Sequence, residues 1–82
     1  MIISIKSEWG EKAEFSLFEG KYRIKLFSQK KGLVDFISKD MSDVVDYMVS
    51  IFVGPIDYFE INGNKNKCPR SQLGTHLQKL IS

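Results

Sequence analysis

The spacing of apolar residues over the first 37 positions constrains this chain most, because it repeats every second residue. This alternation is typical of strands with one buried face, whereas a helix needs apolar residues at every third or fourth position. The pattern therefore predicts three strands that share one apolar face. Their candidate core residues are Ile3 and Ile5, with Trp9 as a further candidate, then Ala13, Phe15 and Leu17, then Tyr22, Ile24 and Leu26.

Turn residues predict how these strands pair. A two-residue turn at Glu19-Gly20 sets Phe15 opposite Ile24 and Glu14 opposite Lys25. Gly10 marks the preceding turn. Because the core residues on both sides of Gly10 are odd-numbered, the loop there needs an odd number of residues, and we expect about three. The first part of the chain is therefore predicted to be an antiparallel meander.

The period changes after a predicted fourth strand over residues 33–37. The next stripe follows the spacing of an amphipathic helix, and it consists of Met41, Val44, Val45, Met48 and Phe52. Asp40 precedes this stripe and is predicted to cap the helix with its carboxylate. Gly54-Pro55 is predicted to end the helix, because glycine adopts a left-handed conformation and proline cannot continue a helix.

The last third of the chain predicts a fifth strand over residues 56–61, followed by a turn at Asn62-Gly63. Residues 64–67 are then either a solvated loop or a short edge strand. A terminal helix opens at Pro69, Arg70 and Ser71, and its Gly74 indicates close packing on the sheet. Its apolar stripe is Leu73, Leu77, Leu80 and Ile81. The predicted fold is α+β in the order ββββαβα, a mostly antiparallel sheet with two helices on one face.

Composition places the chain in a broad class. Its 82 residues are expected to form a single domain, 1–82, and the lone Cys68 cannot form an internal disulfide. The first residues lack the pattern of a signal peptide, and no apolar stretch approaches the roughly 20 residues that span a bilayer. We therefore expect a cytoplasmic protein.

Charge is distributed unevenly along the sequence. Residues 35–60 have a net charge of −5, whereas residues 1–34 have +3 and residues 61–82 have +4. Such asymmetry bears on partners rather than on fold. The predicted first helix presents carboxylates and a tyrosine outward, a combination that suits a basic protein partner. The candidate partner-binding residues are Asp40, Asp43, Asp46, Tyr47 and Ser50.

The basic residues support an alternative hypothesis. The off-core positions of the second and third predicted strands carry two phenylalanines beside lysine and arginine, and open sheets with this combination bind single-stranded RNA by stacking bases and neutralising phosphates. The candidate nucleic-acid-binding residues are Phe18, Arg23, Lys25, Phe27, Lys65, Lys67 and Arg70.

Catalytic chemistry has few candidates. Cys68 and His76 lie eight positions apart, which is roughly 12 Å along a helix and too far for a nucleophile and its base. His76 with Lys79 and Arg70 leaves a third hypothesis, a small metal-independent ribonuclease. One cysteine and one histidine do not supply the roughly four ligands of a structural metal site. We therefore expect no catalytic residues, no metal and no cofactor.

In its size, element order and acidic helix surface, the chain resembles the small immunity proteins that bacteria make against contact-dependent or polymorphic toxins. The residues most like those proteins are Asp40, Asp43, Asp46 and Tyr47. The resemblance is architectural, and it implies a non-enzymatic inhibitor that masks a toxin domain such as a nuclease. The net charge of +2 departs from the acidic character of many nuclease inhibitors.

Overall fold

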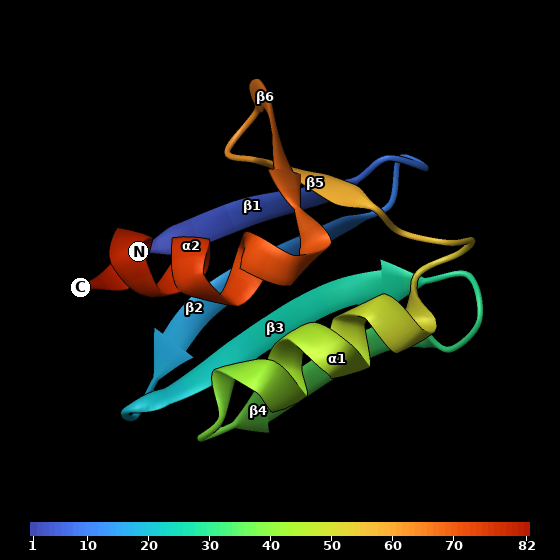
Figure 1. Ribbon diagram of the computed structural model, residues 1–82. Helices are drawn as coiled ribbons and strands as arrows, with labels where there is room; N and C mark the ends of the chain where they lie inside the picture. Colours follow the sequence, from blue (N-terminus) through green and yellow to red (C-terminus); the bar gives the residue numbers. More distant parts are fainter.

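The structure is a computed structural model that describes residues 1–82, with six strands and two helices (Figure 1). A single turn of 3-10 helix, Arg70–Gln72, precedes the second helix. The elements are β1 (Ile2–Ser7), β2 (Lys12–Phe18), β3 (Lys21–Ser28), β4 (Gly32–Ser38), α1 (Met41–Ile51), β5 (Tyr58–Ile61), β6 (Asn64–Pro69) and α2 (Leu73–Ile81).

All six strands form one antiparallel sheet in the order β4-β3-β2-β1-β5-β6. The meander β4 to β1 is sequential, and β5 then pairs with the free side of β1. This architecture confirms the predicted α+β class and element order. The segment after Asn62-Gly63 is the short edge strand that the sequence allowed, so β4 and β6 are the two edges of the sheet.

The β2–β3 hairpin has the predicted register. Phe15 pairs with Ile24 and Glu14 with Lys25. Glu19 and Gly20 both have positive φ, at 52° and 77°, as a two-residue turn of the type I′ class requires. The β1–β2 loop has three residues, as expected, because the Ser7 N–H donates to the Glu11 carbonyl across it. The odd-numbered residues of β1 and β2 therefore share the core face.

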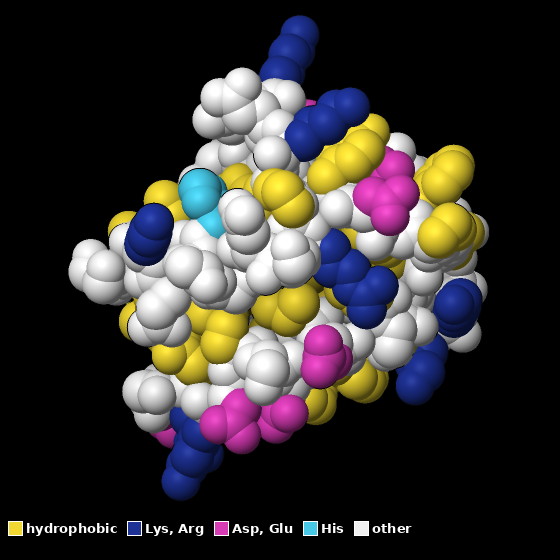
Figure 2. Space-filling model, in the orientation of Figure 1, with side chains coloured by type: hydrophobic (Ala, Val, Ile, Leu, Met, Phe, Trp, Pro, Cys, Tyr) yellow, Lys and Arg dark blue, Asp and Glu magenta, His cyan; other side chains and the backbone are white.

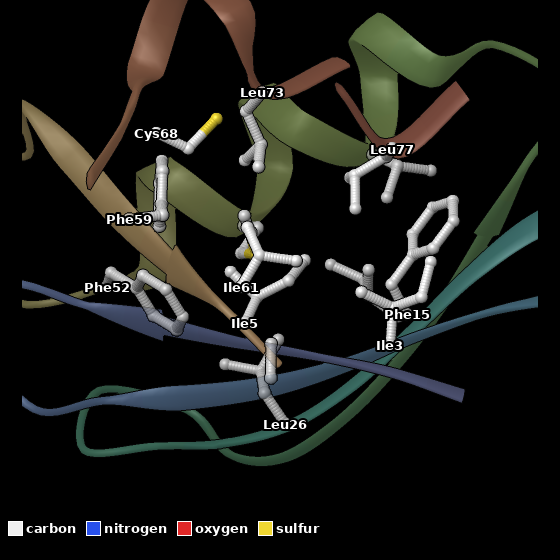
Figure 3. Close-up of a cluster of buried hydrophobic side chains, with 14 of the residues drawn as sticks. Ile3, Ile5, Phe15, Leu26, Phe52, Phe59, Ile61, Cys68, Leu73 and Leu77 are labelled. Carbon is white, nitrogen blue, oxygen red and sulfur yellow. The ribbon is translucent and has the colours of Figure 1, made fainter. Parts of the chain in front are cut away.

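Both helices cover the same face of the sheet (Figure 1). The core lies between the two layers, and Figure 3 shows Leu77 of α2 pointing toward Ile3 and Phe15, and Leu73 toward Ile5 and Ile61. The whole of this core is apolar apart from two buried serines. The hydrophobic core consists of Ile3, Ile5, Ala13, Phe15, Ile24, Leu26, Val44, Met48, Ile51, Phe52, Ile56, Phe59, Ile61, Cys68, Leu73 and Leu77.

Two predicted core residues lie elsewhere. Leu17 is exposed near the end of β2, where it lines a small cavity with Met1 and with Ile81, the last residue of α2. Trp9 belongs to the β1–β2 loop instead of continuing the face of β1, and it is also exposed. Its place on the face of β1 is taken by Ser7, which is buried and accepts hydrogen bonds from the N–H groups of Trp9 and Glu11.

The predicted cap of α1 is wrong in its chemistry, although Asp40 occupies the N-cap position. The Asp40 carboxylate makes no capping hydrogen bond. Ser38 bonds to the N-cap residue and not to the first-turn N–H groups, because its hydroxyl oxygen accepts from the Asp40 N–H and its O–H donates to the Asp43 carboxylate. The helix ends at Ile51, and Gly54 then turns the chain with φ of 77°.

The last elements also differ in detail from the prediction. β5 begins at Tyr58 rather than at residue 56, and the α-helix begins at Leu73 after the 3-10 turn. A Cβ atom on Gly74 would lie 3.3 Å from the Cγ of Met41 on α1. The close approach at Gly74 is therefore between the two helices, not between α2 and the sheet.

The opposite face of the sheet has no helix on it and is called the open face below. Strand alternation places Arg23, Lys25 and Phe27 of β3 and Leu33, Asp35 and Ile37 of β4 on this face. Several large apolar side chains are exposed there, with Phe27 at 65% and Leu33 at 87%. Neither helix of the protein has the length and apolar character needed to cross a bilayer.

Candidate functional site

The outer side of α1 carries three exposed carboxylates, Asp40, Asp43 and Asp46, which we call the acidic surface. The one salt bridge of the protein lies elsewhere, so no basic side chain neutralises them. Asp43 accepts a hydrogen bond of 3.1 Å from Ser38, which fixes one of its oxygens. Figure 2 shows carboxylates in magenta over the region where α1 runs, with an apolar strip between that region and α2.

Tyr47 and Ser50, the other two predicted partner-binding residues, make contacts within the protein. Tyr47 is half-buried and its ring stacks on Phe36 of β4, with the centroids 4.3 Å apart. The Lys31 ammonium lies 5.6 Å from the centroid of the Tyr47 ring. The exposed Ser50 hydroxyl donates to the Tyr47 carbonyl at 2.6 Å. Tyr47 therefore joins α1 to β4 and is not a free anchor for a partner.

The centre of the predicted nucleic-acid surface is occupied by an ion pair. Arg23 donates two hydrogen bonds to Asp35 on the neighbouring strand, at 2.8 Å from Nε and 2.5 Å from Nη2. These bonds lower the pKa of the Asp35 carboxyl and raise the pKa of Arg23. The guanidinium also lies 4.9 Å from the ring centroid of Phe18. Arg23 thus contacts both Asp35 and Phe18 within the protein.

Phe27 remains exposed on the open face, and Lys25 lies between two carboxylates, opposite Glu14 on β2 and Asp35 on β4. Together with Lys12 and Leu33 they line a shallow groove of about 660 Å³. Phe27 and Leu33 are directly opposite each other on β3 and β4. An exposed aromatic ring beside two lysines suits a nucleobase and its phosphates, whereas the aliphatic Leu33 suits a protein.

The three other predicted nucleic-acid residues lie away from Phe27. Lys65 and Lys67 are on β6, at the opposite edge of the sheet from β3 and β4. The Lys67 ammonium lies over the Tyr58 ring, 4.3 Å from its centroid. Arg70 lines the groove between the two helices, on the covered side of the sheet. The seven residues therefore do not form one surface, because the sheet order separates β3 from β6.

The groove between α1 and α2 was not expected from the sequence. It has a volume of about 690 Å³, an apolar floor that includes Met41, Val45 and Gly74, and Asp46 and Arg70 among its polar lining residues. Gly74 was the one sequence signal for it, since glycine inside a helix costs about 1 kcal/mol and often marks a close approach.

Cys68 and His76 both line a second groove, of about 850 Å³, between β6 and α2. Burial raises the pKa of the Cys68 thiol, which disfavours the thiolate that a nucleophile requires. Lys79 lines this groove as well, but Arg70 does not, so the predicted ribonuclease set is divided between two grooves. No three His, Cys, Asp or Glu side chains cluster as they would around a metal ion.

The β1–β2 loop is hydrogen-bonded to the segment between α1 and β5. The Trp9 indole N–H donates to the Pro55 carbonyl at 2.6 Å, and the Glu8 carboxylate accepts from the Asp57 N–H at 2.5 Å. Glu11 accepts from the Val53 N–H in the same region. Glu8 and Glu11 are therefore structural acceptors of backbone hydrogen bonds and do not extend the acidic surface.

Comparison with protein-family models, with curated proteins and with solved structures finds no match for this chain.

Proposed function

We propose that this protein is a non-enzymatic inhibitor that binds a basic protein partner through its acidic surface, in the manner of bacterial immunity proteins that neutralise a cognate toxin. The partner is a toxin domain, for which a nuclease is the favoured class. Binding masks the partner's surface and requires no catalysis, metal or cofactor from this chain.

One observation carries the proposal: the carboxylates of Asp40, Asp43 and Asp46 are exposed and free of ion pairs, whereas Arg23 is neutralised by Asp35. Exposed, unpaired charges of one sign attract an oppositely charged partner and speed its association. The free charge on the outer side of α1 is therefore acidic, whereas the neighbouring C-terminal segment carries the unpaired cations Arg70 and Lys79. The α1 side favours a basic partner over nucleic acid.

The proposed setting is the bacterial cytoplasm, where an immunity protein meets a toxin that has entered the cell. A single free cysteine is compatible with that reducing compartment. The raised pKa of Cys68 and its burial also protect it from adventitious oxidation.

The test is affinity capture from the native bacterium, followed by binding kinetics with the captured protein. The double variant Asp43→Lys, Asp46→Lys should associate at least about tenfold more slowly at low salt, and salt should weaken the wild-type complex. Glu14→Lys, Glu19→Lys changes the net charge by the same amount away from α1, and it is the matched control.

The inhibitor function is tested separately by expression of the captured protein. That protein should arrest growth when expressed alone, and co-expression with this chain should restore growth. Equal binding of the α1 double variant and the wild type would contradict the acidic surface, and a harmless captured protein would contradict the inhibitor function.

A second candidate function is single-stranded RNA binding on the open face, favoured by the exposed Phe27 beside Lys12 and Lys25. Phe27→Ala should then weaken RNA binding by about tenfold or more through lost stacking, and Lys25→Ala should flatten its salt dependence. Arg23 is a poor probe because its substitution also breaks the pair with Asp35. An unchanged RNA affinity in Phe27→Ala would reject this candidate.

A further inference from the structure

The two edges of the sheet differ in how they are protected. β6 carries Lys65, Lys67 and Pro69, and its pairing with β5 is interrupted by a register shift. Lysine, proline and bulges on an edge discourage a further strand from pairing with it. β4 has seven residues, Gly32–Ser38, with neither lysine nor proline. An edge of this kind is a ready template for strand pairing.

The hydrogen-bond pattern identifies which backbone groups face the free edge of β4. The Ser7–Glu11 bond shows that β1 and β2 bond through odd-numbered residues. Because alternate residues of a strand point their N–H and C=O groups to opposite sides, β2 bonds to β3 through its even-numbered residues. These pair with odd-numbered residues of β3, so the even-numbered residues of β3 bond to β4. The even-numbered residues of β4 therefore bond to β3.

The N–H and C=O groups of Leu33, Asp35 and Ile37 thus point away from the sheet. None of them takes part in the turn, loop or cap hydrogen bonds or in those with side chains. The side chains of the same three residues lie on the open face, where Leu33 is 87% and Ile37 39% exposed. Backbone groups and apolar side chains at this edge both lack a partner within the chain.

We propose that β4 is a self-association surface, through which two copies of this chain pair antiparallel about a twofold axis and join their sheets. The occupant of the edge is a second copy because the ends of β4 carry opposite charges. Lys30 and Lys31 precede the strand, and Lys39 is followed by Asp40 and Asp43. An antiparallel arrangement sets the basic end of one copy beside the acidic end of the other.

The register with full overlap is centred on Asp35. It places Leu33 opposite Ile37 of the second copy, which makes an apolar pair on the open face, and Lys30 opposite Asp40 of the second copy. It also sets Lys31 opposite Lys39 of the second copy, a like-charge contact that opposes pairing. The twofold repeats each contact. Three pairs at the edge, with two hydrogen bonds each, give about six hydrogen bonds between the copies. The edge strand thus offers complementary backbone and apolar groups in this register, with Lys30 and Asp40 as its complementary charges.

The same register sets the two Asp35 side chains opposite each other at the axis, and like charges directly opposite oppose pairing. Each Asp35 is held by two hydrogen bonds from Arg23 of its own chain, which offset the repulsion. We therefore expect a reversible dimer with a dissociation constant in the range of about 1–100 μM, weaker than an obligate dimer.

Sedimentation velocity on the purified full chain, from about 1 to 500 μM, tests the proposal across the expected range. The wild type should pass from monomer to dimer. Ile37→Pro removes one N–H at the free edge while leaving the bonds to β3, and it should abolish the dimer over this range. The control is Leu17→Lys, which changes an exposed apolar residue away from β4 and should dimerise as the wild type does. Ile2→Pro would not serve as a control, because β1 is an internal strand.

Charge reversal tests the register. Lys30→Glu alone and Asp40→Lys alone should each weaken the dimer by roughly tenfold at low salt, because each creates two like-charge contacts. An equimolar mixture of the two variants should recover the wild-type dimer, because both contacts are then between opposite charges. Circular dichroism and thermal unfolding of each variant separate lost pairing from lost folding.

Two outcomes would overturn the proposal: a wild type that remains monomeric at the highest concentration, or a dimer that is indifferent to Ile37→Pro in a folded protein. In the first case the edge of β4 is left for a strand of another protein. If the mixture of Lys30→Glu and Asp40→Lys does not recover the dimer, the register centred on Asp35 is wrong. None of these measurements uses the partner of the proposed function, so the two proposals fail independently.

Discussion

The ring of Tyr47 on α1 lies stacked on the ring of Phe36 on β4, with 4.3 Å between the centroids and 19° between the planes. This contact joins the acidic helix to the edge strand of the sheet. It gives Tyr47 a structural role that the outward position predicted from the sequence did not suggest.

The Tyr47 ring should therefore contribute to folding. Tyr47→Ala should lower the free energy of unfolding by about 2 kcal/mol, because it removes half-buried area and an aromatic pair. Tyr47→Phe keeps the stack and should leave stability nearly unchanged. Urea unfolding followed by circular dichroism measures both. A Tyr47→Ala variant as stable as the wild type would show that the ring is free to bind a partner after all.

Two phenylalanines on neighbouring strands should differ strongly in the stability that is lost when each is truncated. Phe15→Ala should cost about 3–5 kcal/mol, since the side chain is fully buried opposite Ile24. Phe27→Ala removes the same atoms from the open face and should change stability by less than about 0.5 kcal/mol. Thermal and urea unfolding compare the two variants. Similar losses would mean that something covers the open face.

Gly54 and Gly20, which both have φ of 77°, provide a matched pair. Gly20→Ala should cost about 1–2 kcal/mol for the left-handed backbone alone, because its Cβ would meet nothing. Gly54→Ala should cost more, since its Cβ would lie 3.1 Å from the Trp9 indole nitrogen. The emission of Trp9, the one tryptophan, should shift in Gly54→Ala and not in Gly20→Ala. Equal costs and equal spectra would contradict the contact.

Acid should remove the stabilisation that the Arg23–Asp35 pair provides. The folded protein lowers the pKa of Asp35, so the pair stabilises fully above the unfolded pKa near 4 and loses its effect as the pH falls through the folded value. The difference in Tm between the wild type and Asp35→Asn should be largest at neutral pH and shrink below about pH 4. Arg23→Gln should give the same profile. A constant difference across this range would contradict the pair.

Cys68 should react slowly, because burial raises the pKa of its thiol. Alkylation by iodoacetamide at neutral pH should be at least about tenfold slower than for an unfolded control in urea. His76→Ala should leave the rate in the folded protein unchanged. A slower reaction in that variant would mean that His76 activates the thiol, and it would revive an enzymatic role for the groove that both residues line.

The sheet was predictable where local rules and long-range packing agreed. Phe15 and Ile24 have matching apolar stripes on both sides of a Glu19-Gly20 turn, so the register of β2 and β3 followed from the sequence. The period of two failed at Leu17 and Trp9, because alternation identifies a face of a strand and does not show how far the helices extend over it. Only the placement of α1 and α2 decides which residues on that face are buried.

The surface was harder to predict than the fold. Asp35 and Arg23 lie on different strands, and their pairing depends on the diagonal geometry between β3 and β4. Similarly, Lys67 and Arg70 are near each other in sequence but lie on separate surfaces, because the strand order sends β6 to the far edge and the chain then turns to the helix layer. Charge in a sequence window therefore gave the acidic helix correctly and overestimated the basic surface.

The lysines and proline of β6 determine how large an assembly this chain can build. When two β4 strands pair, each outer edge of the joined sheet is a β6 strand, with Lys65, Lys67 and Pro69 on it. A third copy then finds no receptive edge, so growth stops at two and does not continue into a fibril. Because one edge of the sheet can pair with another strand and the other edge cannot, self-association stops at a dimer. The protein can therefore keep an unprotected edge strand without forming polymers.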